Sequence, residues 1–155
     1  MSPRRRLVFF ALVAAQLILP LGLIGMNELA LATGTKVTLL TQPLDPLDPF
    51  RGRYVELSYE ISRLPDRGTP SGTVYVELIR KGDRWVVYRV HSTHPHGDRP
   101  VIRGDAGDGF AVYGIETYYA DEDEAPRLEG LQGRLLVDIV LDDGGKARID
   151  GVRVR

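Results

Sequence analysis

Residues 54–62 read Tyr-Val-Glu-Leu-Ser-Tyr-Glu-Ile-Ser and alternate between apolar and polar side chains with a period of two. Successive side chains of a β-strand point to opposite faces of a sheet, so this period predicts a half-buried strand. The core face is predicted for the apolar residues at alternate positions, Val55, Leu57, Tyr59 and Ile61. Tyr54 would then lie on the opposite face, where packing alone does not explain an aromatic side chain.

The rest of the chain after residue 33 carries the same kind of pattern, which short turns interrupt. Further strands are predicted at residues 36–41, 73–80, 84–91, 110–119, 135–141 and 146–154. Residues 81–83 and 142–145 have the composition of hairpin turns, and Gly151 marks a β-bulge where the apolar phase shifts. Residues 121–133 read as a loop with at most one helical turn. Seven or eight short strands predict an all-β domain, either a sandwich or a partly open barrel.

One N-terminal segment departs from this pattern, because residues 7–25 contain no charged side chain. As a helix they would be about 28 Å long, close to the roughly 30 Å thickness of the hydrocarbon core of a bilayer. Three arginines at residues 4–6 precede the segment, and the positive-inside rule places them in the cytoplasm. We therefore expect a cytoplasmic N-terminus at 1–6, a transmembrane signal anchor at 7–25, a linker at 26–33 and an extracytoplasmic β domain at 34–155.

Cleavage of the N-terminal segment is the alternative to anchoring. Ala30-Leu31-Ala32 has the small-x-small form of a signal-peptidase site. The apolar run is longer than the 7 to 15 residues usual in a signal peptide, which favours a retained anchor in the inner (cytoplasmic) membrane. The sequence leaves both readings open.

Charge and composition limit the possible functions. Lys and Arg number 20 and Asp and Glu number 21 in the 155 residues, and three of the basic residues lie before the apolar segment. The β domain therefore has no excess of positive charge with which to bind nucleic acid. The chain has no cysteine, so its stability must come from the hydrophobic core.

A proline-rich segment, residues 43–54, is the first candidate site. Pro43, Pro46 and Pro49 restrict the backbone and prevent regular structure. The segment is either a rigid crossover between strands or a preorganised edge for a ligand or protein partner. In the second case the binding residues would be the polar and aromatic members, Asp45, Asp48, Arg51, Arg53 and Tyr54.

Gly52-Arg53-Tyr54-Val55-Glu56-Leu57-Ser58-Tyr59 resembles the signature of the GDYXXLXY family of uncharacterised, membrane-anchored bacterial proteins. The sequences at residues 33–37, 43–46, 113–119 and 145–147 are also similar to that family, so the resemblance spans nearly the whole chain. It implies a membrane partner, since family members often lie beside multi-pass membrane proteins. One position differs, because Arg53 occupies the place of the aspartate in the signature.

Chemical activity has only weak candidates. The three histidines, His91, His94 and His96, lie within six residues of one another, a spacing that could suit zinc or copper but also occurs in solvated loops. Ser58, Ser62, Ser71 and Ser92 lack the context of an activated nucleophile, and Lys81 lies in an exposed turn. We therefore expect no cofactor and a non-catalytic module that binds a membrane or cell-envelope protein. The alternative is an envelope hydrolase or peptidase with a site near Asp45–Tyr54.

Overall fold

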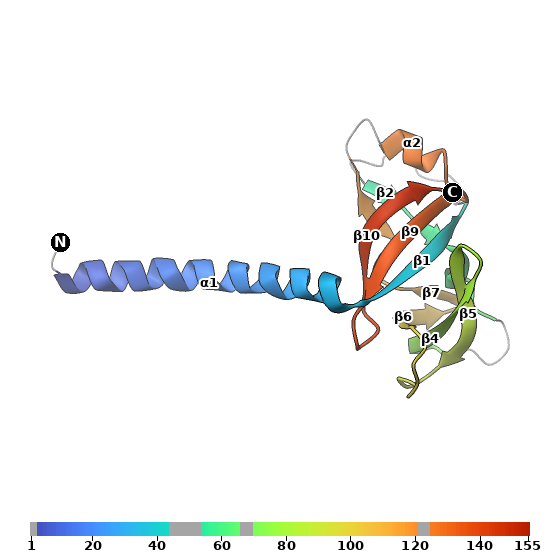
Figure 1. Cartoon of the computed structure of the whole chain (residues 1–155), viewed down its shortest axis with the longest axis horizontal. Coiled ribbons are helices and arrows are strands. Elements are labelled where there is room, and N and C mark those ends of the chain that lie inside the picture. The colour runs from blue at the N-terminus through green and yellow to red at the C-terminus, as the bar shows by residue number, and fades with distance from the viewer. Residues whose placement is uncertain (1–2, 44–53, 66–69, 121–124) are drawn as a thin grey trace. The chain divides into compact units, whose positions relative to one another are not determined.

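A computed structural model of the chain describes residues 3–43, 54–65, 70–120 and 125–155 (Figure 1). The chain divides into two compact units, one ending at Thr33 and the other running from Gly34 to Arg155.

The first unit is a single helix, α1, which spans Pro3–Thr33 and contains Pro20 in its interior. Many of its large apolar side chains are exposed, namely those of Phe9, Phe10, Leu12, Leu17, Ile18, Leu19, Leu21, Leu23 and Ile24. Within the part of the chain that the structure describes, no helix is long and apolar enough to cross a membrane.

The second unit is mostly β-structure. Its described residues form ten strands, β1 (Thr35–Gln42), β2 (Tyr54–Glu56), β3 (Ser58–Tyr59), β4 (Gly72–Lys81), β5 (Arg84–His91), β6 (Val101–Gly107), β7 (Phe110–Val112), β8 (Thr117–Tyr119), β9 (Leu135–Leu141) and β10 (Ala147–Val154). A 3-10 turn, η1 (Glu60–Ser62), follows β3, and a short helix, α2 (Ala125–Glu129), precedes β9. The predicted helical turn within residues 121–133 corresponds to α2.

The strands form three antiparallel sheets. Their strand orders are β10-β9-β1-β3, β2-β8 and β5-β4-β6-β7. The turns predicted at residues 81–83 and 142–145 lie at the hairpins β4–β5 and β9–β10, whose connections are residues 82–83 and 142–146. The register of β10 on β9 shifts between Ile149 and Gly151, which confirms the predicted bulge.

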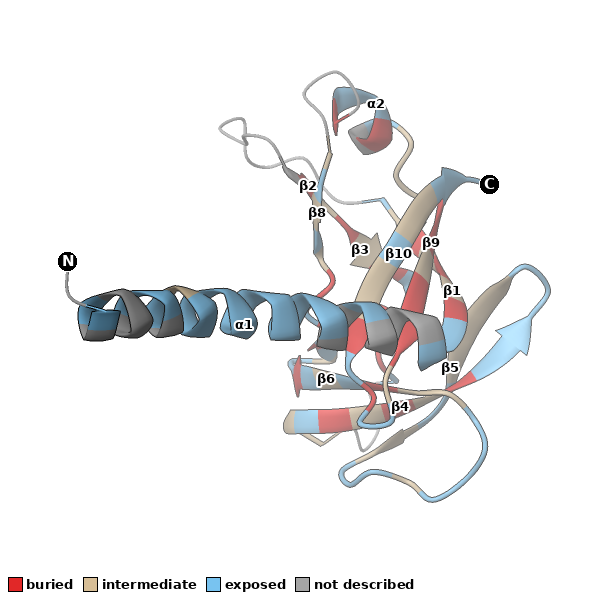
Figure 2. Cartoon of the chain, turned by 60° about the vertical axis from the view of Figure 1, so that its left-hand side comes forward, coloured by how far each residue is buried: buried red, intermediate tan, exposed pale blue. Residues whose placement is uncertain are grey.

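One hydrophobic core lies between the sheets. Its members include Leu39 of β1, Val76 of β4, Ile102 of β6 and Ile139 of β9, each 0% exposed. In β9 every residue except Asp138 is buried, so this strand lies at the centre of its sheet (Figure 2). The predicted inward face of residues 54–62 is also confirmed, because Val55, Leu57, Tyr59 and Ile61 are all buried.

The predicted number of strands was too low. The run at 54–62 is broken into β2, β3 and η1, and the run at 110–119 is broken into β7 and β8, with Gly114 at a φ of +78° between them. The sequence analysis also missed β6, which pairs with β4 and β7.

Packing explains why β6 has no strand-like composition. It contains Gly104, and a Cβ there would lie 2.8 Å from Cδ1 of Tyr113 and 2.9 Å from the carbonyl oxygen of Val112. The tyrosine ring thus covers the glycine backbone, and glycine is required by this close approach rather than by a turn.

Candidate functional site

The signature segment around Tyr59 is bound to the chain between β7 and β8. The Tyr59 hydroxyl donates a hydrogen bond to the Ile115 carbonyl oxygen at 2.6 Å, and the Tyr113 hydroxyl donates to the Ile61 carbonyl oxygen at 2.7 Å. The Leu57 N–H donates to the carbonyl oxygen of Glu116 at 2.7 Å. These reciprocal bonds hold two segments side by side that lie more than fifty residues apart in the sequence.

Both tyrosine hydroxyls lie in an environment that disfavours ionisation. Burial raises the pKa of Tyr59 and of Tyr113 above the ordinary value, and the negative charge of Glu116 raises both further. The Glu116 carboxylate itself accepts a hydrogen bond from the Tyr113 N–H at 2.6 Å. A neutral hydroxyl that donates to a buried carbonyl is suited to holding the fold, not to proton transfer near neutral pH.

The other residues proposed from the signature region are only partly described. Asp45, Asp48, Arg51 and Arg53 lie outside the described residues. Tyr54 lies in β2, and its backbone pairs with Tyr119 of β8. The hypothesis of a binding edge at residues 43–54 therefore stays a prediction.

His91 and His94 contact separate partners, and His96 is exposed. His91 Nε2 lies 3.3 Å from Oε2 of Glu77. The other carboxylate oxygen of Glu77, Oε1, accepts a hydrogen bond from Arg99 at 2.9 Å. The His94 ring packs edge-on against Tyr75, with 5.3 Å between ring centroids. No group of three or more His, Cys, Asp or Glu in the described ranges is arranged to hold a metal ion.

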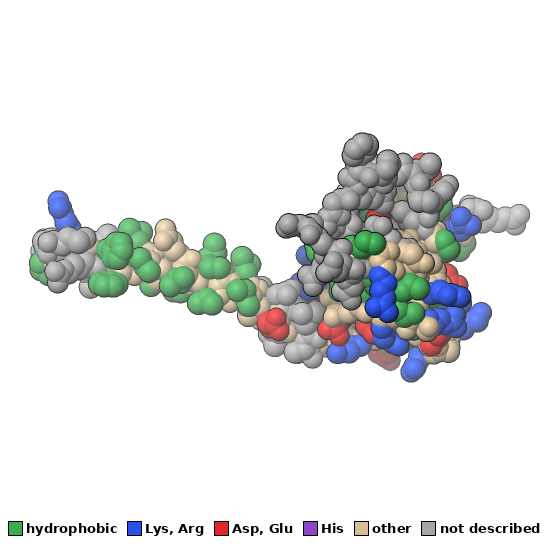
Figure 3. All heavy atoms as spheres, turned by 90° about the horizontal axis from the view of Figure 1, so that it is seen from above, with side chains coloured by type: hydrophobic (Ala, Val, Ile, Leu, Met, Phe, Trp, Pro, Cys, Tyr) green, Lys and Arg blue, Asp and Glu red, His purple; other side chains and the backbone are tan. Residues whose placement is uncertain are grey.

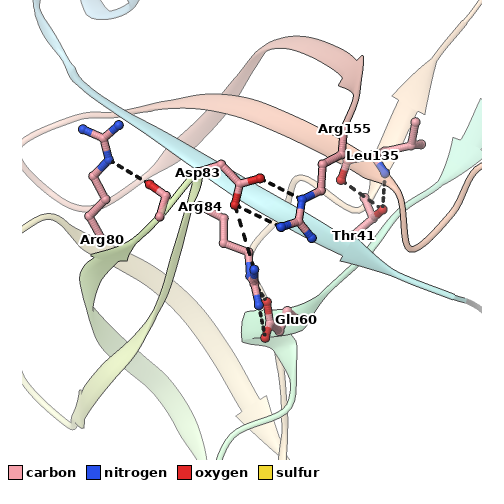
Figure 4. A network of polar contacts seen from close by, with 8 residues as sticks. Thr41, Glu60, Arg80, Asp83, Arg84, Leu135 and Arg155 are labelled. Carbon is pink, nitrogen blue, oxygen red and sulfur yellow. Dashed lines mark hydrogen bonds and ion pairs between the residues drawn. The ribbon is translucent and has the colours of Figure 1, made fainter.

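A chain of ion pairs joins the β4–β5 turn to the C-terminus (Figure 4). Arg84 donates to both carboxylate oxygens of Glu60, at 2.6 and 3.3 Å. Arg155 donates to Asp83 at 2.7 Å, and the Arg155 N–H donates to the Arg134 carbonyl oxygen at 2.8 Å. The side-chain charges of Glu60, Asp83, Arg84 and Arg155 are thus all paired within this network, which links Arg155 to the β4–β5 turn.

Charged side chains of both signs are interspersed over the face of the domain seen in Figure 3.

One surface hollow lined by described residues is a groove of about 490 Å³ between the end of β1 and the turn that leads into β9. We call it the β1 groove. It is lined by Leu40, Thr41, Gln42, Pro43, Glu60, Gly130, Gln132, Gly133 and Arg134. Its floor is fixed by the buried Thr41 hydroxyl, which donates to the Leu135 carbonyl oxygen at 3.2 Å and accepts from the Gly133 N–H at 3.1 Å.

Two smaller hollows lie elsewhere on the domain. One, of about 350 Å³, lies between β4, β6, β7 and the start of β10, and Arg103 and Lys146 line it. The other, of about 200 Å³, lies beside Thr35 and includes His94 and Asp98. Sequence reasoning identified neither the groove nor these hollows as sites, because each gathers residues from strands that become neighbours only in the folded domain.

The comparisons with known proteins identify a family. The family model described as GDYXXLXY protein matches residues 16–152, which is well over half of the chain. The searches of curated proteins and of solved structures gave no match. The chain belongs to the GDYXXLXY protein family.

Proposed function

We propose that this protein is a membrane-tethered, non-catalytic binding module whose partner is another membrane or cell-envelope protein. The observation that carries the proposal is the β1 groove, an open hollow with a rigid floor and a cationic side chain at its rim. The groove is open to solvent rather than enclosed, which suits an extended segment of a protein partner.

The tether is proposed from the sequence. Residues 7–25 carry no charge and follow arginines at residues 4–6, which favours a cytoplasmic N-terminus and an extracytoplasmic domain. Large apolar side chains, including Phe10, Ile18 and Leu19, are 67%, 69% and 72% exposed on α1. An apolar surface of this kind needs a covering medium, and a lipid bilayer would provide one.

The chemistry of the β1 groove favours a partner segment that presents a carboxylate. In the described part of the chain the Arg134 guanidinium has no ion pair, whereas the groove's carboxylate, Glu60, is bound by Arg84. Guanidinium groups bind carboxylates through two parallel hydrogen bonds. Leu40 and Pro43 supply apolar contact beside this charge.

The groove also adjoins the proline-rich segment, because Pro43 lines it and residues 44–53 follow directly in the sequence. Asp45, the first of the binding residues proposed from sequence, follows Pro43 by two positions. Variants of this segment are therefore tested together with variants of the groove.

The environment of the candidate nucleophiles supports binding over hydrolysis. Ser58 Oγ accepts a hydrogen bond from Gln42 at 2.8 Å, and Lys81 is exposed at the end of β4. A serine nucleophile needs a base within hydrogen-bond reach, and the partner of Ser58 is an amide, which is not a base.

Affinity purification of the full chain from detergent-solubilised membranes of its own host tests this function. We expect one membrane or envelope protein to be enriched with the wild type, and strongly reduced with Arg134→Glu, because a reversed charge repels the partner's carboxylate. Arg51→Ala and Tyr54→Ala test whether the adjoining segment contributes.

Arg127→Glu is the matched control, since Arg127 is an exposed arginine of α2 that lines none of the three hollows. Fluorescence of the single tryptophan, Trp85, confirms that each variant is folded. If no protein is enriched over background, or if Arg134→Glu retains the partner as well as Arg127→Glu does, the proposal fails.

A further inference from the structure

The 350 Å³ hollow, which we call the β6 hollow, gathers two cationic side chains from different sheets. Arg103 comes from β6 and Lys146 from the residue before β10. The lining is completed by Thr73, Gly104, Asp105, Val112 and Tyr113. It therefore combines positive charge, the Thr73 hydroxyl, one carboxylate and a small apolar wall.

A close backbone contact brings the two cations together. The Arg103 N–H donates to the Gly145 carbonyl oxygen at 2.7 Å, which binds the tip of the β9–β10 hairpin to β6. Gly145 is buried, has a φ of +81°, and a Cβ there would lie 3.0 Å from the Val101 carbonyl oxygen and 3.1 Å from the Arg103 nitrogen. Only glycine permits this approach, and Lys146 follows it immediately.

The charges of the β6 hollow are not compensated within the described residues. Neither Arg103 nor Lys146 takes part in any of the ion pairs that the structure shows, although Lys36, Arg84, Arg99, Arg148, Arg153 and Arg155 all do. Asp105 is the one carboxylate in the lining. Two cations facing one carboxylate leave the hollow with a net positive charge.

We infer that the β6 hollow binds a phosphate ester. A guanidinium fork and an ammonium group together match a phosphate dianion, and the Thr73 hydroxyl can donate to a third oxygen. The exposed side chain of Val112 would contact the organic part of the ester. This inference does not depend on the proposed protein partner, because the β1 groove and the β6 hollow share no residue.

The ester could be a soluble metabolite or the headgroup of an anionic phospholipid, and the experiment separates the two. Full-length protein labelled with ¹⁵N, in a non-ionic detergent, is titrated with inorganic phosphate and with glycerol 1-phosphate, and glycerol is the neutral reference. In a parallel arm the protein is placed in nanodiscs of phosphatidylcholine with or without phosphatidylglycerol. The signals followed are the backbone amides of Thr73, Gly104 and Gly145.

We expect saturable shifts of these amides with the phosphate compounds and none with glycerol. Arg103→Gln and Lys146→Gln should each weaken binding about fivefold, which equals about 1 kcal/mol for one charge at contact distance in water. Arg127→Gln, which removes an exposed charge elsewhere, should leave the affinity unchanged. Asp105→Asn should strengthen binding, because it removes the carboxylate that repels the anion.

The sign of the Asp105→Asn effect is the sharpest criterion, because a cationic ligand would bind this variant more weakly. Shifts in the soluble arm identify a soluble ester, and shifts that need phosphatidylglycerol identify a lipid headgroup. The inference is overturned if neither arm shifts these amides, if Arg103→Gln and Lys146→Gln bind as the wild type does, or if Asp105→Asn weakens binding.

Discussion

Tyr59→Phe isolates the contribution of the signature tyrosine to the fold. The substitution keeps the buried ring and removes the hydroxyl that donates to the Ile115 carbonyl oxygen at 2.6 Å. Tyr59 is 0% exposed, so water cannot replace the lost donor at that carbonyl. A buried acceptor left without its partner costs about 1–2 kcal/mol, and we expect this decrease in the free energy of unfolding at pH 7.

The same variant should change the response of stability to alkali. Burial raises the pKa of Tyr59 in the folded protein above the ordinary value of 10.0. As pH rises past 10, the unfolded chain loses this proton while the folded chain keeps it, so the unfolded state binds fewer protons and stability falls. Each such tyrosine contributes a slope of about −1.4 kcal/mol per pH unit. Tyr113 contributes in the same direction, and Tyr59→Phe should remove about half of their joint slope.

Urea unfolding of the full chain in a non-ionic detergent, followed by Trp85 fluorescence between pH 7 and pH 11, measures both effects. Tyr119→Phe is the control at neutral pH, because that side chain is 78% exposed and its substitution should change stability by less than about 0.5 kcal/mol. Lysine deprotonation affects all variants alike, so the difference between wild type and Tyr59→Phe reports Tyr59. An unchanged alkaline slope in Tyr59→Phe would refute the assignment of a buried, hydrogen-bonded hydroxyl.

Two further substitutions probe the packing of β6 and the outer face of β9. Gly104→Ala should lower the free energy of unfolding by about 1–3 kcal/mol, measured with urea, because the new Cβ would lie 2.8 Å from the Tyr113 ring. Gly107→Ala in the same strand is the control, since a Cβ there meets nothing within 4 Å. Its stability should equal that of the wild type apart from the difference in strand propensity between glycine and alanine. Hydrogen bonds from Arg153 lower the pKa of the Asp138 carboxyl in the folded protein. The ionised carboxylate therefore stabilises the fold above its ordinary pKa, and this stabilisation is lost as pH falls and the carboxylate is protonated. Asp138→Asn should therefore flatten the fall of the melting temperature between pH 6 and pH 3, and an acid limb as steep as that of the wild type would contradict this.

Alternation of apolar side chains was sufficient to predict most of the strands and the inward face of residues 54–62. It failed at β6, where Gly104 and Gly107 reduce the strand signal and the partner of Gly104 is the distant ring of Tyr113. Local sequence does not reveal a glycine that is required by a tertiary contact.

The candidate sites were harder to predict than the strands, for the same reason. Arg103 and Lys146 are 43 positions apart and become neighbours only through the hydrogen bond between Arg103 and Gly145. Arg134 and Pro43 meet in the β1 groove only because β1 pairs with β9. Compact motifs such as the three histidines are easy to see in a sequence, yet His91 and His94 contact different partners in the fold.

The buried signature residues account for the stability of this fold and do not identify what the protein binds. Leu57 and Tyr59 occupy the core, and their backbone and hydroxyl groups bond to the segment between β7 and β8, so both residues are explained by stability alone. A substitution that keeps these contacts keeps the fold whatever the protein binds. Arg53, where this chain departs from the signature, precedes that buried run in the sequence and lies outside the described residues. Differences in binding within the family should therefore be sought at positions outside the buried signature residues, and here the β1 groove and the β6 hollow are the surfaces to test.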